Sequence, residues 1–368
     1  MKAPVHPAVA RALGGYEPTP EQAAAIYHPP EPLALIAGAG SGKTAVMAAR
    51  IAHLVTSGAA RPSRIVGLTF TNKAAHELDE RIRRALAEVD LPPGEEVAVF
   101  TYHGFADRLV RDFGPKIGVE PEVALLSPAQ VYLLIERLFS EITFETLRVT
   151  WLPSLVDKVR QLADACGNHL VTPEQVAEAD AAMAAAYERE GTAPPRDLER
   201  VLTERPELCK VVRAYIDRKR EMGRIDYGDQ IALAHRIVQE RPEVAAQLRE
   251  RWPVVLLDEY QDTNVSQRKM MEAIYPAGSS VTVVGDPDQA IYAWRGATLF
   301  NILEFPQHFP RASGEAADVK TLQRSFRSGR RILAAADAII AEIPAERRGG
   351  EKVLEHHPPT GEGEVRAD

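Results

Sequence analysis

The segment from Ala37 to Thr44, with the sequence AGAGSGKT, could hold the phosphates of a nucleotide. A glycine-rich loop between a buried strand and a helix wraps backbone N–H groups around phosphate oxygens, and the helix dipole adds to the attraction. In such a loop Lys43 reaches the terminal phosphates and Thr44 places its hydroxyl on magnesium. Ala37 stands where the first glycine is usual, but the glycines at 38, 40 and 42 keep the backbone permissive. We therefore predict an ATP site with magnesium, against the alternative of a plain glycine-rich turn.

A pair of carboxylates supplies the partner that such a loop needs. Asp258 and Glu259 directly follow Val254-Val255-Leu256-Leu257, which reads as a buried strand. Ligands collect at the carboxyl ends of parallel strands, so Asp258 is expected to hold magnesium. Glu259 is expected to orient and deprotonate the attacking water. Taken alone, the pair is more often an exposed turn, and only the phosphate loop upstream favours the catalytic interpretation.

The elements that must position these groups alternate along the chain. Short apolar runs, most of them followed by amphipathic helical patterns, predict an α/β protein with a parallel sheet flanked by helices. The expected strands are Leu33 to Ile36, Ile65 to Phe70, Val97 to Tyr102, Val254 to Asp258 and Val281 to Gly285. Between about Arg108 and Arg224 only helical patterns occur, which predicts a helical insertion. A strand at Val319 to Leu322 and a helix from about Ser328 to Ile343 indicate the start of a second α/β domain.

Composition bounds the class of protein. Apolar residues make up 45% and charged residues 26% of the chain, and no run approaches the roughly 18 apolar residues that a membrane-spanning helix needs. Met1 to Ala10 resembles neither a secretory signal nor a transit peptide, so we expect a cytosolic protein. The net charge of −8 gives no hint of a nucleic-acid partner. Cys166 and Cys209 are expected to be buried thiols, not a zinc site or a disulfide.

Further motifs occur in a fixed order around the loop and the carboxylates. They are Thr19-Pro20-Glu21-Gln22, Thr69-Phe70-Thr71-Asn72-Lys73-Ala74-Ala75, Thr101-Tyr102-His103-Gly104, Ile225-Asp226-Tyr227, Asp258-Glu259-Tyr260-Gln261-Asp262, Gly285-Asp286-Pro287-Asp288-Gln289, Ile291-Tyr292-Ala293-Trp294-Arg295-Gly296 and Ser325-Phe326-Arg327-Ser328. With them the chain resembles the UvrD/Rep/PcrA family of superfamily 1 DNA helicases, the RecA-like P-loop NTPases that move along DNA. The resemblance spans Thr19 to Ser328, and together the motifs are highly specific.

The resemblance implies roles on the nucleotide side. Gln22 would hydrogen-bond the adenine edge, although Thr19 before Pro20 and Glu21 also fits a helix start, and both can be true. Gln289 would sense the γ-phosphate, and Arg327 would reach the same phosphate. Ala45 stands where many relatives have an arginine, and Phe326 replaces the usual tyrosine, so the adenine clamp is expected to be looser. The implied catalytic residues are Lys43, Asp258, Glu259, Gln289 and Arg327, and the implied nucleotide contacts are Gln22, Ala39, Gly40, Ser41, Gly42, Lys43, Thr44, Ala45 and Phe326.

The resemblance also implies contacts to DNA. A translocating motor holds single strands by base stacking and backbone contacts without reading sequence. Phe70 and Trp294 would stack on bases with help from Tyr292, although core packing is the better interpretation for Phe70 and Tyr292 taken alone. The residues expected to contact the strand or its phosphates are Thr71, Asn72, Thr101 and His103.

The domain plan follows from the same resemblance. Residues 1–107 plus 226–310 would form the ATP-binding domain 1A, residues 108–225 the helical domain 1B, and residues 311–368 the truncated beginning of a second RecA-like domain, 2A. The expected function is that of the N-terminal motor part of an ATP-dependent 3′→5′ DNA helicase or translocase, cytoplasmic and associated with the nucleoid. Expected partners are single-stranded and duplex DNA and repair or recombination proteins, with no membrane. Without the missing C-terminal motor domain, we expect weak ATPase activity and no unwinding.

Three other interpretations stay open at this point. The chain could be the motor part of a helicase-nuclease of the RecBCD or AdnAB kind, or a regulatory module that binds a nucleotide without motor activity. A phosphate-loop kinase of a small molecule is the least favoured, because it would need neither Phe70 nor Trp294 on its surface.

Overall fold

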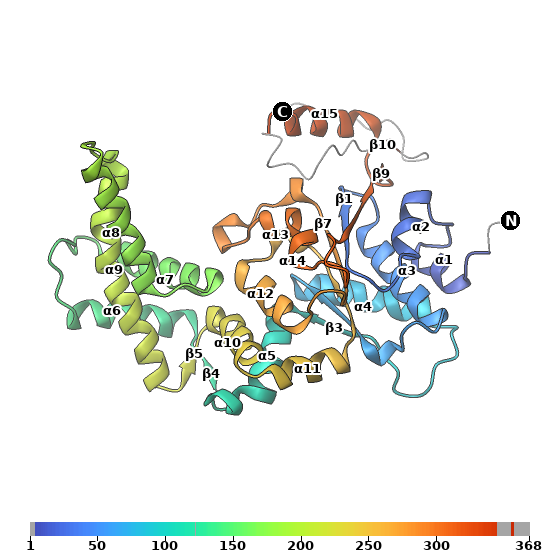
Figure 1. Cartoon of the computed structure of the whole chain (residues 1–368), viewed down its shortest axis with the longest axis horizontal. Helices are drawn as coiled ribbons and strands as arrows, with labels where there is room; N and C mark the ends of the chain where they lie inside the picture. Colours follow the sequence, from blue (N-terminus) through green and yellow to red (C-terminus); the bar gives the residue numbers. More distant parts are fainter. Residues whose placement is uncertain (1–3, 122, 344–354, 357–368) are drawn as a thin grey trace. The chain divides into compact units, whose positions relative to one another are not determined.

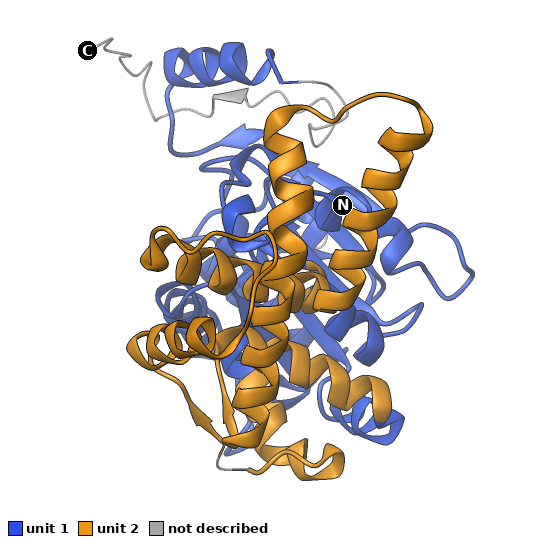
Figure 2. Cartoon of the chain, turned by 90° about the vertical axis from the view of Figure 1, so that its left-hand side faces the viewer, with its two compact units in different colours: residues 1–105, 241–264, 268–368 blue, residues 106–240, 265–267 orange. Residues whose placement is uncertain are grey.

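The computed structural model describes residues 4–121, 123–343 and 355–356. The chain divides into two compact units, which Figure 2 shows in different colours. Unit 1 comprises residues 1–105, 241–264 and 268–368, and unit 2 comprises residues 106–240 and 265–267. The helical insertion expected at 108–225 thus lies within unit 2, which continues further, to Glu240.

Unit 1 is built on a parallel sheet, as predicted. In the described part of the chain this sheet has six strands in the order β3-β2-β6-β7-β1-β8, and every neighbouring pair is parallel. The strands are β1 (Leu33–Ala37), β2 (Ile65–Thr69), β3 (Ala98–Thr101), β6 (Val254–Leu257), β7 (Ser280–Gly285) and β8 (Asp318–Leu322). All residues of the four inner strands are buried, which explains why these segments are mostly apolar and show no alternation of apolar and charged residues.

Helices cover both faces of this sheet (Figure 1). On one face lie α1 (Pro7–Ala12), α2 (Pro20–Ile26), α3 (Lys43–Thr56) and α4 (Asn72–Leu86), and on the other lie α12 (Val265–Ile274), α13 (Phe300–Leu303) and α14 (Phe305–His308). The apolar sides of α1 to α4 form one core with the strands. Two further helices are α5 (Tyr102–Phe113), which begins in unit 1 and continues into unit 2, and α11 (Pro242–Arg251).

The strand expected to open a second domain belongs to the first sheet. β8 pairs in parallel with β1 along its whole length, from Leu33 opposite Asp318 to Ala37 opposite Leu322. The boundary predicted at residue 311 is therefore wrong for this strand, because the local pattern of a strand does not reveal which sheet it joins. Outside the sheet follow β9 (Arg324–Ser325), which pairs with β10 (Glu355–His356), and α15 (Arg330–Ile340). The rest of the predicted second domain, residues 344–354 and 357–368, lies outside the described residues.

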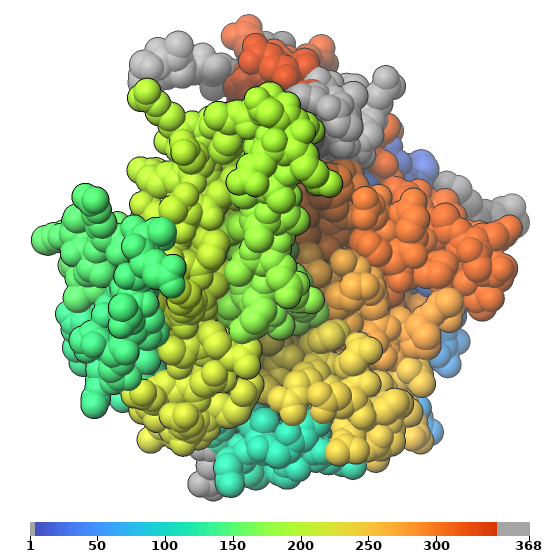
Figure 3. Space-filling model, turned by 60° about the vertical axis from the view of Figure 1, so that its left-hand side comes forward, coloured from blue at the N-terminus to red at the C-terminus, as the bar shows by residue number. Residues whose placement is uncertain are grey.

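Unit 2 is mainly helical. It contains α6 (Pro128–Glu141), α7 (Leu152–His169), α8 (Pro173–Arg189), α9 (Arg196–Glu221) and α10 (Tyr227–Glu240), with a short parallel pair of β4 (Ala124–Leu125) and β5 (Arg224–Ile225). Its core comes from the apolar sides of α6, α7 and α9. α8 runs beside α9 (Figure 3), and capping boxes at Ser127 and Thr172 fix where α6 and α8 begin. The buried thiols of Cys166 and Cys209 lie on α7 and α9, as predicted. No helix among the described residues is long and apolar enough to cross a membrane.

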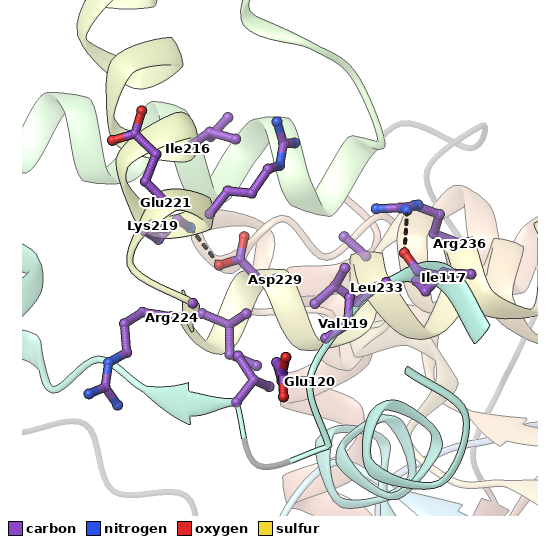
Figure 4. Close-up of a pocket in the computed structure, with 16 residues that line it drawn as sticks. Ile117, Val119, Glu120, Ile216, Lys219, Glu221, Arg224, Asp229, Leu233 and Arg236 are labelled. Carbon is purple, nitrogen blue, oxygen red and sulfur yellow. Dashed lines mark hydrogen bonds and ion pairs between the residues drawn. The ribbon is translucent and has the colours of Figure 1, made fainter. Parts of the chain in front are cut away.

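A buried lysine organises the end of α9. Nζ of Lys219 lies 2.6 Å from one carboxylate oxygen each of Asp226 and Asp229, and 4.4 Å from the centre of the Tyr215 ring. The hydroxyl of Tyr215 donates to the same Asp226 oxygen at 2.7 Å. Figure 4 shows Lys219 and Asp229 in the wall of a cavity of about 560 Å³. In the Ile225-Asp226-Tyr227 motif, Asp226 lies between β5 and α10. Its ion pair with Lys219 therefore holds this connection against α9.

Replacing Lys219 by methionine should strongly destabilise unit 2. The lysine is 4% exposed, so its removal leaves two poorly solvated carboxylates without their cation. Breaking a buried ion pair in this way typically costs about 3–5 kcal/mol. Urea unfolding followed by circular dichroism measures the change. The control is Lys158→Met, since Lys158 is 45% exposed beside Glu204 and its pair should contribute less than about 1 kcal/mol. Equal small losses for both variants would contradict the prediction.

Candidate functional site

The glycine-rich loop has the conformation that its sequence requires. It connects β1 to α3, and Gly40 and Gly42 have φ values of +75° and +86°, which side chains rarely allow. The hydroxyl of Ser41 donates to the carbonyl oxygen of Gly38 at 2.7 Å and closes the loop. Lys43 is the first residue of α3, and Thr44, half-buried, is the second. The loop thus presents its backbone at a helix N-terminus, where anions bind.

The two predicted carboxylates lie at the carboxyl end of β6, and one of them contacts the loop. Nζ of Lys43 is 3.3 Å from Oε2 of Glu259, although the two residues are far apart in sequence. Asp258 is 3% exposed, and burial together with the charge of Glu259 raises its pKa to about 7. Glu259 has φ +47°, and among the described residues other than glycine only Leu170, at +55°, also has a positive φ. Such strained backbone is tolerated mainly where function demands a fixed side chain.

The donor set fits magnesium that arrives with phosphate. The Asp258 carboxylate and the Thr44 hydroxyl are hard oxygen ligands, and a cation would offset the cost of burying Asp258 in its charged form. Among the described residues no cluster of three histidine, cysteine or acidic side chains forms a complete metal site. Magnesium at such sites uses one or two protein oxygens and takes the rest from phosphate and water.

A hydrogen-bonded chain leads from Glu259 to Gln289 through Gln261 and Asp286, two residues for which no role was predicted. Nε2 of Gln261 donates to Oε2 of Glu259 at 2.9 Å, and Oε1 of Gln261 accepts from the backbone N–H of Asp286 at 2.9 Å. The Asp286 carboxylate in turn accepts from Nε2 of Gln289 at 2.5 Å. Gln261 and Asp286 are each 2% exposed. Both are polar residues in short segments that follow buried apolar strands, and this was the signal that could have identified them.

The segment that carries Phe326 and Arg327 packs directly on the glycine-rich loop. The backbone N–H of Phe326 donates to the carbonyl oxygen of Gly40 at 2.8 Å, and the hydroxyl of Ser325 donates to that of Ala39 at 3.1 Å. A Cβ atom on Gly40 would lie 2.6 Å from Cβ of Arg327. The backbone and Cβ atom of Arg327 therefore lie beside the loop, and the residue is exposed to solvent. Ser325, which is fully buried, is a third residue for which no role was predicted.

Gln22 fulfils the helix-start interpretation and also touches the loop. Its Oε1 accepts from the backbone N–H of Thr19 at 3.1 Å, and the hydroxyl of Thr19 accepts from the backbone N–H of Gln22, which completes a capping box on α2. Its Nε2 lies 3.4 Å from the carbonyl oxygen of Ser41. Ala45 lies in the first turn of α3, half-buried, and Phe326 is 38% exposed.

The three predicted aromatic residues gather in one place with an arginine. The rings of Phe70 and Tyr292 stack with centroids 5.2 Å apart, and the centroid of Trp294 is 6.2 Å from that of Tyr292. The Arg295 guanidinium lies 4.7 Å from the Trp294 ring centre. Trp294 is 74% exposed, whereas Phe70 and Tyr292 are half-buried. We call these four residues the aromatic surface.

Two of the residues predicted to contact DNA, Thr71 and Thr101, also cap helices. The Thr71 hydroxyl accepts from the backbone N–H of Ala74 at the start of α4, where Thr71 and Asn72 are exposed. The Thr101 hydroxyl accepts from the backbone N–H of Gly104 at 3.0 Å. His103 is half-buried, and burial and the charge of Arg295 lower its pKa. The positive charge of Arg295, which belongs to the aromatic surface, thus acts on His103.

Comparison with known proteins agrees with this arrangement. The family model of the UvrD/REP helicase N-terminal domain matches residues 18–310. The ATP-dependent DNA helicase PcrA of Leuconostoc citreum is 31% identical over 320 residues, which cover 87% of this chain and 38% of the relative. PcrA of Bacillus subtilis is 30% identical over 333 residues, or 89% and 40%. The ATP-dependent DNA helicase UvrD1 of Mycobacterium leprae is 31% identical over 346 residues, or 90% and 40%.

The chain spans about two fifths of the length of these relatives. The matched region contains the loop, both carboxylates, the chain of side chains to Gln289 and the aromatic surface. On these grounds the chain belongs to the UvrD/Rep family of helicases.

Proposed function

We propose that this chain is the ATP-binding part of the motor of a 3′→5′ DNA helicase or translocase. The ion pair between Lys43 of the loop and Glu259 beside β6 carries the proposal, because it unites the two halves of an ATP-hydrolysing site. The relatives are named as ATP-dependent DNA helicases, which supports the same activity. Work on chromosomal DNA would place the protein in the cytoplasm with the nucleoid, among repair or recombination proteins.

On the nucleotide side, each residue has a distinct task. The loop from Ala39 to Thr44 would cradle the phosphates, and Thr44 and Asp258 would hold magnesium, which neutralises charge on the phosphates. With phosphate bound, Lys43 would turn from Glu259 to the phosphate oxygens, and Glu259 would be free to accept a proton from the attacking water. Gln261 keeps the Glu259 carboxylate oriented, at 2.9 Å. Gln289 and Arg327 would contact the γ-phosphate.

On the DNA side, the aromatic surface offers a platform for bases. An exposed tryptophan beside an arginine and a stacked pair of rings suits unpaired bases of any sequence. Thr71, Asn72, Thr101 and His103 would contact the strand close by. Gln289, where the chain of hydrogen bonds ends, lies only three residues before Tyr292. The same segment would therefore serve both the nucleotide and the DNA. Duplex DNA would be the substrate of unwinding.

Replacing Trp294 by alanine should weaken the binding of single-stranded DNA. Stacking on an aromatic side chain contributes about 1–3 kcal/mol per base, which corresponds to a loss of roughly 5- to 150-fold in affinity. Fluorescence anisotropy with a labelled oligothymidine measures the affinity. Trp151→Ala is the control, because Trp151 is 68% exposed in unit 2 and outside the aromatic surface. If both variants lost affinity equally, the proposed platform would be wrong. A parent chain without affinity for oligothymidine would favour the kinase alternative.

Residues 1–368 as an isolated polypeptide should hydrolyse ATP slowly and gain little from single-stranded DNA. The family resemblance implies further γ-phosphate and DNA contacts in parts of the relatives that these residues do not match. Phosphate release with and without oligothymidine tests this expectation, and vigorous stimulated turnover would overturn it.

A further inference from the structure

Arg50, in the middle of α3, is a fully buried cation. It is 1% exposed, and its guanidinium donates four hydrogen bonds. Nη1 donates to the carbonyl oxygens of Ala25 at 2.9 Å and His28 at 2.8 Å, and Nη2 donates to that of Pro29 at 2.9 Å. Nε donates to the hydroxyl of Thr282 at 3.0 Å. Each of the three guanidinium nitrogens thus donates at least one hydrogen bond.

These four bonds connect the elements that form the nucleotide site. Ala25 lies in the last turn of α2, the helix that carries Gln22, and His28 and Pro29 follow that helix before β1. Thr282 lies on β7, whose end leads to Asp286 and the chain to Gln289. Arg50 itself lies two turns after Lys43 on α3. One side chain thus ties the end of α2 to α3, which begins with Lys43, and to β7, which leads to Asp286.

The partners of Arg50 are unusual for a buried arginine. In the described part of the chain they are three carbonyl oxygens and one hydroxyl, with no carboxylate. Burial lowers the pKa of the guanidinium to about 10. The carbonyls at the end of a helix lack partners within that helix, so they are natural acceptors for a cation. A guanidinium presents five N–H donors in a fixed planar fork, whereas a lysine ammonium has three at the tip of a flexible stem and none at the position of Nε, so lysine cannot reproduce all four bonds.

We propose that Arg50 is a positioning residue for recognition of the nucleotide base. By fixing the end of α2, it keeps the amide of Gln22 beside the loop, where its Nε2 lies 3.4 Å from the carbonyl oxygen of Ser41. The inference rests on the proposed ATP site and deepens it, because it separates the control of base selectivity from the binding of phosphates. The loop itself depends on its own glycines and Ser41, so it should keep its shape when α2 loosens.

The test compares three ligands in the parent chain and in Arg50→Lys. We expect the affinity for ATP to fall roughly tenfold, about one strong hydrogen bond, while the affinities for GTP and inorganic tripolyphosphate change less than twofold. Isothermal titration with magnesium present measures all three. The matched control is Tyr275→Phe, which removes a buried hydrogen bond of 3.0 Å to the carbonyl oxygen of Trp252 in the same unit. It should lower the melting temperature and leave the ratio of ATP to GTP affinity unchanged.

A second variant loosens the same contact while Arg50 stays in place. Pro29→Gly frees the segment that contributes two of the three carbonyls, and it should produce the same loss of selectivity to a smaller extent. It decides the question if Arg50→Lys does not fold. Parallel losses for ATP, GTP and tripolyphosphate, or no change in selectivity, would overturn the positioning role. A parent chain that binds none of the three ligands would instead overturn the proposed ATP site.

Discussion

Replacing Glu259 by glutamine is expected to reduce ATP turnover by roughly 10²- to 10⁴-fold while nucleotide affinity is kept. The amide cannot accept the proton of the attacking water, but it removes a negative charge from the neighbourhood of the phosphates. Lys43→Ala should abolish turnover as well, and it should also weaken nucleotide binding, because the lysine directly follows the glycine-rich loop at the N-terminus of α3, where it would meet the phosphates. The split between the two variants is the informative result, since Lys43 and Glu259 are paired at 3.3 Å in the described structure.

Radiolabelled ATP under single-turnover conditions suits a slow basal rate, and titration calorimetry gives the affinities. The control is Glu88→Gln, since Glu88 is paired with Arg11 in the same unit and is 75% exposed. It should change neither quantity. Turnover that survives both Lys43→Ala and Glu259→Gln would remove the catalytic assignments.

Replacing Gly40 by alanine should reduce turnover about 100-fold with little effect on nucleotide affinity. The new Cβ atom would lie 2.6 Å from Cβ of Arg327 and 2.8 Å from the hydroxyl oxygen of Ser325, so the segment from Ser325 to Arg327 must move away from the loop. A displacement of about 1 Å in a catalytic group can cost about 100-fold in rate. The backbone N–H groups that face the phosphates are not blocked by this change, which is why the affinity should stay within about fivefold.

Gly58 provides a closely matched control for this variant. Its φ of +74° equals that of Gly40 within a degree, but a Cβ atom there would have no neighbour within 4 Å. Gly58→Ala should therefore show only the cost of the left-handed conformation, about 1–2 kcal/mol in unfolding free energy. Gly40→Ala should show the same cost and the loss of turnover in addition. If the two variants had equal turnover, the contact between the loop and Arg327 would have no catalytic importance.

Local features of the fold and the site were predictable from the sequence. The loop at Ala37 to Thr44 and the carboxylates after β6 depend on residues next to each other in the chain, so pattern and turn chemistry identify them. The pairing of β8 with β1 was not predictable, because strands far apart in the sequence carry no local mark of their neighbours. The same reason applies to the contact of Ser325 with Ala39, which joins residues from opposite ends of unit 1.

Residues with buried polar side chains were the second feature that could not be predicted from the sequence. Arg50 lies among apolar residues of α3, and only the fold shows that its guanidinium meets carbonyl oxygens at and just after the end of α2. Gln261 looks like a turn residue after the carboxylates, yet it links Glu259 to Asp286. Glu259 itself adopts a backbone conformation that no propensity would assign to glutamate. Sites of this kind violate local preferences, because their geometry is set by tertiary contacts.

The pairing of β8 with β1 has a mechanical consequence. The two strands end side by side at Ala37 and Leu322, so the glycine-rich loop and the segment with Arg327 leave the same stiff sheet at neighbouring points. Phe326 and Ser325 add a second connection, because they are hydrogen-bonded to the carbonyl oxygens of Gly40 and Ala39, so a shift of the segment with Arg327 would strain the loop backbone directly.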